Sequence, residues 1–346
     1  MNILFKSYNT CCQNKNGGVQ SRLRSIANKL KNRGENVELF NEFTTDISQF
    51  DIIHFFKLEP ENYALLKCAK SNGLKVVISS VIGLSDSNGK KLRLFQKIRR
   101  LMPFTTTMEQ SVNSLELADL IIVETESEKT FIVRNYNISS DKIVIIPNGV
   151  DYVDYKGKEI YEAIGGEKRY ILQVGRFDKN KNQLNVINAM KETGIDIVFA
   201  GGKDHSENDN YYQRCIDAAD GASNIHFLGW LDANSDLMKS AYANADTLIL
   251  PSYQETFGMV AIEGGVAGAK LALSKTLPIL GYPIFDECAT FNPGDIEDIK
   301  KTLIETSKKE KSDHFTARFR EAFSWNSVID EHIKYYMEIL NESNNK

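Results

Sequence analysis

The segment DTLILPSYQETFGMVAIEGGVAGA, residues 246–269, decides the fold class of this chain. It opens with a short apolar run that predicts a buried strand. A polar loop follows, and a helix is expected to begin near Phe257-Gly258, where the sequence becomes apolar over a helical length. A strand that passes through a short loop into a helix is the repeating unit of α/β proteins with parallel sheets.

The same alternation of strand and helix extends along the whole chain. In the second half, strands are predicted at YILQVG (170–175), IDIVFAGG (195–202), NIHFLG (224–229), DTLILPS (246–252) and KLALS (270–274). In the first half they are predicted at NILFKS (2–7), NVELF (36–40), DIIHFF (51–56), KVVISS (75–80), DLIIV (119–123) and KIVII (142–146). Short β-branched strands separated by helices indicate parallel sheets that are covered on both faces.

The segment PNGVDYVDYKGKE, residues 147–159, interrupts this alternation with Pro, Gly and charged residues. We interpret it as the connection between two domains, residues 1–150 and residues 151–325. Residues 326–346 continue an amphipathic pattern, so we expect a C-terminal helix that packs back on the N-terminal domain. The expected architecture is therefore α/β, with two domains that each contain a parallel sheet.

The composition of the chain argues against several classes of protein. The chain has 346 residues, 42% hydrophobic and 25% charged, which argues against a disordered polymer or a membrane bundle. Its net charge of −4 divides into +5 for residues 1–150 and −9 for the remainder, which does not favour a general nucleic-acid binder. Five cysteines without a Cys-x-x-Cys pair, and an N-terminus unlike a signal peptide, lead us to expect a cytoplasmic protein.

Two loops contain the residues best suited to bind a ligand. Glu255 follows a predicted strand, at the sheet edge where open α/β sheets bind ligands, and Glu263 follows in the next helix. Arg176 and Lys181 follow another predicted strand, in VGRFDKNKNQ (174–183). Cations and a helix N-terminus can bind a diphosphate, and carboxylates can accept hydrogen bonds from sugar hydroxyls. Taken separately, both pairs are equally compatible with ordinary solvated charges.

Together these residues give the chain a resemblance to the retaining glycosyltransferases of family 4, which have the GT-B fold of two Rossmann-like domains. The resemblance covers essentially the whole chain. Arg176 and Lys181 match the family's diphosphate-binding Arg and Lys, and Glu255 and Glu263 match its paired glutamates within PSxxExFG. Gly17-Gly18-Val19 is similar to the opening glycine loop of the family.

The resemblance implies a role for each matching residue. Arg176, Lys181 and Glu255 would be the catalytic group, with Glu255 on the donor sugar. Glu263 would bind the nucleotide ribose, and the turn at Leu228–Leu231 would hold the base. The further donor-binding residues implied are Gly18, Gly175, Leu228, Phe257, Gly258, Met259 and Val260. The implied reaction is front-face transfer with retention, in which the leaving phosphate oxygen takes the acceptor proton.

The chain departs from the family pattern in its first domain. Many relatives carry a histidine after the fourth strand, where this chain reads VISSVIG (77–83). His54 follows a strand and could line a cleft, although such a histidine is more often structural. The family's usual Pro after the second Glu is absent, with Lys270 near that place. The sequence has no Asp-x-Asp pattern and only scattered histidines, so we expect no metal and no other cofactor besides the nucleotide-sugar substrate.

The segment KKLRLFQKIRRLMPF, residues 90–104, has six basic residues, no acidic residue and several large apolar ones. This pattern is typical of a helix that lies on a membrane surface, and it equally fits a solvated helix that packs on its own domain. The first interpretation suits a lipid-linked acceptor at the inner face of the cytoplasmic membrane.

The leading hypothesis is a glycosyltransferase that uses a nucleotide-sugar, with UDP favoured, in surface polysaccharide biosynthesis. A soluble small-molecule acceptor or a GDP-sugar donor is the alternative within the same fold. It would make activity independent of membranes and indifferent to neutralising Arg99 and Arg100. A non-catalytic partner subunit is a different class of function, and the four intact site residues argue against it. An NAD-dependent enzyme is disfavoured because no Gly-x-Gly occurs.

Overall fold

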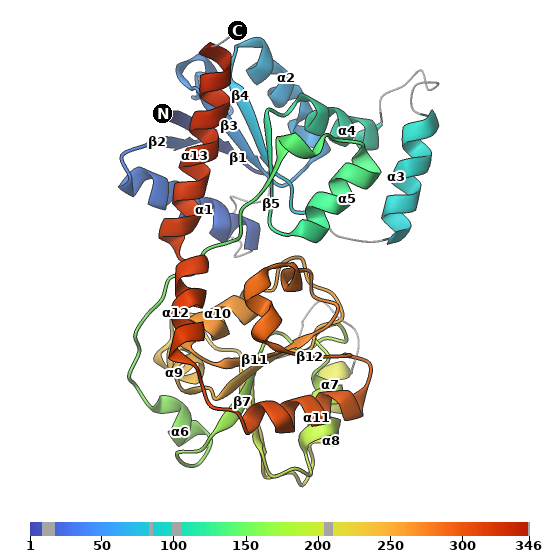
Figure 1. Cartoon of the computed structure of the whole chain (residues 1–346), viewed down its shortest axis with the longest axis vertical. Coiled ribbons are helices and arrows are strands. Elements are labelled where there is room, and N and C mark those ends of the chain that lie inside the picture. The colour runs from blue at the N-terminus through green and yellow to red at the C-terminus, as the bar shows by residue number, and fades with distance from the viewer. Residues whose placement is uncertain (9–17, 83–85, 99–105, 204–209, 345–346) are drawn as a thin grey trace. The chain divides into compact units, whose positions relative to one another are not determined.

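The computed structural model describes residues 1–8, 18–82, 86–98, 106–203 and 210–344. The chain divides into two compact units (Figure 1). The first consists of Met1–Gly149 together with Trp325–Lys346, and the second of Val150–Ser324. Both units are α/β, which confirms the fold class expected from the alternation of strands and helices.

The first unit is built on a six-stranded parallel sheet with the order β2-β1-β3-β4-β5-β6. Helices α1 and α13 cover one face of the sheet, and α2 to α5 cover the other (Figure 1). The strands are β1 Asn2–Lys6, β2 Asn36–Leu39, β3 Ile52–Phe56, β4 Lys75–Ser79, β5 Leu120–Val123 and β6 Ile143–Ile145. The helices are α1 Gly18–Asn32, α2 Tyr63–Ser71, α3 Asp86–Ile98, α4 Thr107–Leu117, α5 Glu126–Tyr136 and α13 Trp325–Asn344.

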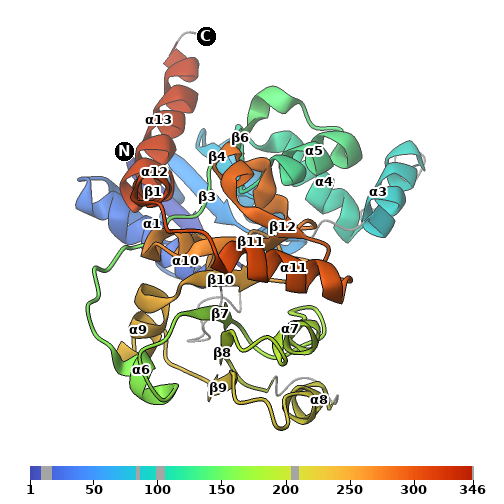
Figure 2. The same cartoon turned by 60° about the horizontal axis from the view of Figure 1, so that its bottom comes forward.

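The second unit contains a parallel sheet with the order β12-β11-β10-β7-β8-β9. Helices α7, α8 and α11 cover one face, and α6, α9, α10 and α12 cover the other (Figure 2). The strands are β7 Tyr170–Val174, β8 Asp196–Ala200, β9 Ile225–Gly229, β10 Thr247–Leu250, β11 Lys270–Ser274 and β12 Ala289–Phe291. The helices are α6 Glu159–Ala163, α7 Gln183–Met190, α8 Tyr211–Ala218, α9 Asp236–Asn244, α10 Met259–Ala267, α11 Ile296–Ser307 and α12 Asp313–Ala322.

All eleven strands expected from the sequence are present, and the three-residue strand β12 is an addition. Strands such as β3, β5 and β10 were recognisable because their side chains are buried on both faces, so their sequences are almost wholly apolar. Strand β12 contains only Ala289, Thr290 and Phe291, and it pairs with the edge of β11. A run this short carries no readable period in the sequence.

Helix α13 completes the core of the first unit. Its apolar side chains, including Val328, Ile329 and Tyr336, pack with residues of α1, β1 and β3. His54 of β3 is fully buried, with its Nδ1 2.6 Å from Tyr336 Oη and its Nε2 2.8 Å from Ser79 Oγ. Burial holds the pKa of His54 well below its ordinary value, so the ring is neutral. His54 is therefore a structural residue that joins α13 to the sheet.

A buried ion pair lies in the first unit, near this histidine. Arg22 of α1 and Glu124, which follows β5, are 2.7 Å apart, and both side chains are at most 10% exposed. Burial raises the pKa of Glu124, and the neighbouring guanidinium opposes that shift. Among the described residues, no hydrogen-bond partner reaches Arg22 Nε or Nη2, although both atoms are buried. The guanidinium is thus incompletely satisfied, a situation in which desolvation can outweigh the attraction between the charges.

The loss in free energy of unfolding should therefore depend on whether Arg22 and Glu124 are replaced singly or together. We expect Glu124→Leu or Arg22→Met alone to lower the free energy of unfolding by about 3–5 kcal/mol, because each removes the opposite charge from a buried ion pair. The double variant should recover most of that loss, since neither charge remains. Urea denaturation of the three variants measures this coupling, and losses that simply add would contradict it.

Candidate functional site

Most of the predicted site residues lie at one edge of the sheet in the second unit. Gly175 to Lys181 follow β7, the turn at Leu228–Leu231 includes the end of β9, and Glu255 follows β10. Because neighbouring parallel strands end at the same edge, the loops after β10, β7, β8 and β9 lie in that order along it. We call this group of loops the carboxyl edge of the second sheet.

The structure brings Lys181 and Glu255 together. Lys181 Nζ is 2.5 Å from Glu255 Oε1, and the two side chains are 20% and 15% exposed. Asn180 connects the same two loops, since its Nδ2 donates to Gln254 O and its Oδ1 accepts from Gln254 N, both at 2.9 Å. The ion pair therefore depends on a backbone connection as well as on charge.

Arg176 lies two residues before Asp178, and the two side chains form a second ion pair. Arg176 Nε donates to Asp178 Oδ2 at 2.7 Å. The Arg176 side chain is 56% exposed, whereas that of Asp178 is 4% exposed. A guanidinium that is both exposed and fixed at Nε is suited to binding an anion at this edge.

The start of helix α10 supplies the backbone part of the site. The helix begins at Met259, one residue after the predicted start, with Gly258 as its N-cap at φ 107°. This left-handed conformation favours glycine. Phe257 is buried in the core, and Met259 and Val260 are half-buried. The amides of a first helical turn lack partners within the helix and favour an anion.

Glu263 lies in the second turn of α10 and contacts Tyr242 of α9. Tyr242 Oη donates to Glu263 Oε2 at 2.5 Å. Burial raises the pKa of Glu263, although the tyrosine hydrogen bond opposes the shift. Helix α10 approaches the sheet closely at Gly264, where a Cβ would lie 2.7 Å from a methyl carbon of Leu248. This close approach determines how near Glu263 lies to the sheet.

Glycines allow the loops after β7 and β8 to meet. A Cβ on Gly201 would lie 1.9 Å from Gly175 O, so no side chain fits at residue 201. Gly175 itself has φ 145° and donates from its amide to Ala200 O at 2.9 Å. Leu228 in β9 is half-buried and packs on the core, so only its backbone is suited to the predicted contact with the base.

Sequence reasoning missed three residues at this site: Asp178, Tyr242 and Trp230. Trp230 is 59% exposed directly after β9, and its Nε1 donates to Lys203 O at 3.3 Å. A large aromatic residue immediately after a predicted strand is a signal that could have identified it. The other two were not recognisable, because their importance comes from the partners that they contact.

The last predicted donor residue, Gly18, belongs to the first unit. It is the exposed first residue of α1. At the carboxyl edge of that unit's sheet, Glu128 Oε1 accepts from Ser80 Oγ at 2.6 Å and from Ile82 N at 2.9 Å. Val81 between them has φ 46°, a strained conformation for a β-branched residue. The loop without the family's histidine is therefore fixed by a buried carboxylate.

The basic segment 90–104 is described as far as Ile98, where helix α3 ends; Arg99, Arg100, Leu101 and Met102 lie outside the described residues. Leu92 is buried, whereas Leu94 and Ile98 are 62% and 42% exposed. Lys90, Lys91 and Lys97 are exposed as well. Leu92 of this helix therefore packs into the core of the first unit, whereas Leu94 and Ile98 are exposed among the lysines.

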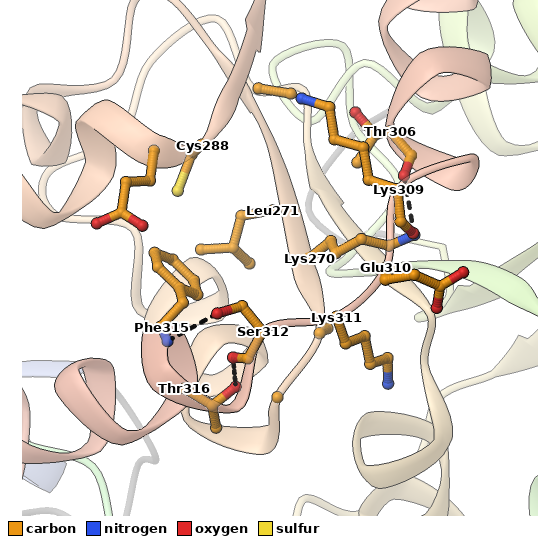
Figure 3. A pocket seen from close by; sticks show the side chains of 14 residues that line it. Lys270, Leu271, Cys288, Thr306, Lys309, Glu310, Lys311, Ser312, Phe315 and Thr316 are labelled. Atoms are coloured by element: carbon orange, nitrogen blue, oxygen red, sulfur yellow. Dashed lines mark hydrogen bonds between the residues drawn. The ribbon is translucent and has the colours of Figure 1, made fainter.

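A cavity of about 130 Å³ lies at the opposite, amino-terminal end of β11, and none of the predicted site residues lines it (Figure 3). Lys270 lies at its side and donates to Thr306 O and Lys309 O, at 2.8 and 2.7 Å. Its Nζ is also 3.0 Å from Asp246 Oδ2. These contacts satisfy the lysine within the fold, so we assign it a structural role.

Two further findings concern the described residues of both units. Among the described residues, no three or more His, Cys, Asp or Glu side chains are grouped so that they could hold a metal ion. None of the described helices is both long enough and apolar enough to cross a membrane.

Comparison with known proteins places these observations in a family. The model described as Glycosyl transferases group 1 matches residues 159–322, and the model described as Glycosyltransferase Family 4 matches residues 41–153. Among curated relatives, the D-inositol 3-phosphate glycosyltransferase of Mycolicibacterium smegmatis is 25% identical over 254 residues. That alignment covers 69% of this chain and 57% of the relative, so this chain spans little more than half of its length.

Solved structures share the fold over nearly the whole chain. HepE of Anabaena, in complex with UDP, has a TM-score of 0.75 at 16% identity, with 98% of this chain and all of that chain covered. The lipopolysaccharide outer core galactosyltransferase WaaB has a TM-score of 0.67 at 16% identity, with 99% and 100% covered. The neighbours share the GT-B architecture, and the two family models match successive parts of the sequence. The chain therefore belongs to glycosyltransferase family 4.

Proposed function

We propose that this chain transfers a sugar from a nucleotide-sugar to a saccharide acceptor, with retention of configuration. The observation that carries the proposal is the contact between Lys181 and Glu255 across two loops of the second unit. It places a cation suited to the diphosphate beside a carboxylate suited to the sugar. UDP is the favoured nucleotide, because the Anabaena neighbour was solved with UDP.

In the proposed reaction, Arg176, Lys181 and the first turn of α10 bind the diphosphate. The acceptor oxygen bonds to the anomeric carbon while the bond from that carbon to the leaving phosphate oxygen breaks. The acceptor proton passes to this phosphate oxygen. The two cations stabilise the negative charge that develops there, a contribution for which fixed groups are effective. Glu255 binds hydroxyls of the transferred sugar, and Glu263 binds the ribose.

We further propose that transfer requires no metal ion. The cations that would balance the diphosphate are Arg176 and Lys181, both at the carboxyl edge of the second sheet. The residues described there do not form a group of carboxylates or histidines typical of a divalent-ion site.

The acceptor is proposed to be lipid-linked, on the inner face of the cytoplasmic membrane, in surface polysaccharide biosynthesis. The exposed Leu94 and Ile98 among the lysines of α3 support this assignment, since such a surface suits an anionic leaflet. The name of the neighbour WaaB, a lipopolysaccharide galactosyltransferase, agrees with it. The second candidate is a soluble polyol phosphate acceptor, which the name of the Mycolicibacterium smegmatis relative favours.

Thermal unfolding with UDP, GDP, ADP, CMP and NAD, in the presence of EDTA, tests the donor class. A ligand at about 100 times its Kd stabilises the folded state by ~2.7 kcal/mol, which raises Tm by several degrees. We expect one nucleoside diphosphate, UDP before GDP, to give that increase without metal. An increase with NAD alone, or only after a divalent metal is added, would contradict the proposal.

Replacement of Glu263 by Gln should separate binding from stability. The raised pKa of Glu263 means that its contribution to folding is full at low pH and is lost as the pH rises through that pKa. We therefore expect Glu263→Gln to have a Tm at least equal to the wild type at about pH 8. Its UDP affinity should fall about tenfold, since a charged acceptor for the ribose hydroxyls is lost.

Calorimetry with UDP and thermal unfolding across the pH range measure both effects. The Tm difference between variant and wild type should close as the pH falls below 4.5, the ordinary pKa of glutamate, because the Glu263 carboxyl is then protonated in both the folded and the unfolded chain. Unchanged UDP affinity would refute the ribose assignment.

Vesicle binding distinguishes the two acceptor hypotheses. We expect the full chain to bind phosphatidylglycerol vesicles. The double variant Leu94→Glu/Ile98→Glu should weaken this binding at least about tenfold, because two apolar side chains that would enter the bilayer are lost. The control is Phe43→Glu/Met337→Glu, which changes two other exposed apolar residues of the first unit. Equal losses in both double variants, or no binding by the wild type, would favour the soluble acceptor.

A further inference from the structure

Asp178 contacts both cationic residues of the proposed donor site. Its Oδ2 accepts from Arg176 Nε at 2.7 Å, and its Oδ1 accepts from the backbone amide of Lys181 at 2.8 Å. Its own carbonyl also accepts from Lys181 N, at 3.1 Å. A single buried carboxylate thus connects the side chain of Arg176, two residues before it, to the turn that follows it.

Two buried glutamines form hydrogen bonds with the backbone of the turn that contains Asp178. Gln183 Nε2 donates to Arg176 O, and Gln173 Nε2 donates to Lys181 O, both at 2.8 Å. These bonds fix the backbone at both ends of the turn. Asp178 adds a constraint on the side chain of Arg176, because a bond to Nε restricts the plane of the guanidinium.

We propose that Asp178 is a positioning residue of the donor site, which aligns Arg176 with the diphosphate of the nucleotide. The inference rests on the proposed function, and it adds to that function a residue that does not itself touch the ligand. The carboxylate also sets the turn from which Lys181 extends to Glu255. Both cations are consequently in place before a donor arrives, which lowers the entropy lost on binding.

The sign of the electrostatic effect makes this proposal testable. A carboxylate near a diphosphate repels it, so a bystander aspartate would weaken binding, and its neutralisation would tighten binding. A positioning aspartate has the opposite effect, since its loss releases Arg176 from the orientation that binds phosphate. The direction of the change in affinity therefore separates the two roles.

The experiment measures UDP affinity by calorimetry for the full chain, for Asp178→Asn and for Asp178→Ser. Asn removes the charge, while Ser can still accept from the Lys181 amide but is too short to reach Arg176. We expect both variants to bind UDP about tenfold more weakly, with unfolding transitions close to the wild type. The matched control is Asp232→Asn, an exposed carboxylate in the loop after β9, which should not weaken binding.

A double variant tests whether Asp178 acts through Arg176. In an Arg176→Ala background, Asp178→Asn should no longer weaken UDP binding and should leave it unchanged or tighten it. Equal or tighter binding by Asp178→Asn in the wild-type background would overturn the proposal. Loss of folding in both single variants would also overturn it, because Asp178 would then be a structural requirement.

The wild type is measured first, so that the two proposals fail separately. If it binds none of the nucleoside diphosphates, the proposed function fails and the role of Asp178 fails with it. If it binds UDP and Asp178→Asn binds UDP no more weakly, only the role of Asp178 fails.

Discussion

The ion pair between Lys181 and Glu255 is the contact on which the architecture of the proposed donor site depends. It joins the loops after β7 and β10, whose strands are neighbours in the sheet. The side-chain amide of Asn180 connects the same two loops, through two hydrogen bonds with the backbone of Gln254. A bound diphosphate would attract Lys181 toward itself, so the lysine is placed to interact with both the sugar side and the phosphate side of a donor.

The parallel sheet explains why these loops meet at all. Neighbouring parallel strands deliver their loops to one edge, and small residues then set how closely the loops approach. Gly201 allows the loop after β8 to contact Gly175, and Gly264 allows α10 to lie close to β10. Larger side chains at either position would move the turn proposed to bind phosphate, or Glu263, outward. The site therefore depends on packing as much as on its charged residues.

The sequence predicted the fold and the principal charged residues, but not the contacts that hold those residues. Strands such as β5 were recognisable because burial on both faces makes them wholly apolar, whereas β12 was too short to show a pattern. Lys181 and Glu255 stood out within family motifs, and their contact follows from strand order. Tyr242 and Asp178 were not predicted, because a tyrosine in an ordinary helix and an aspartate in a polar turn have no distinctive pattern. Likewise the basic segment predicted an amphipathic helix, but not that Leu92 would face the core while Leu94 faces solvent.

His54 of the first unit and Glu263 of the second are polar groups in different electrostatic conditions, and the difference bears on function. In the first unit, His54 is neutral and both of its ring nitrogens have partners, so the group stabilises the fold without a ligand. In the second, Glu263 is half-buried with a pKa that desolvation raises, and it accepts a hydrogen bond from Tyr242, so its ionised form is unfavourable for folding. A carboxylate in that condition gains most from a ligand that brings hydroxyl donors. Glu263 is thus better suited to binding than to stability, which is the relation expected where a fold retains a local strain for its function.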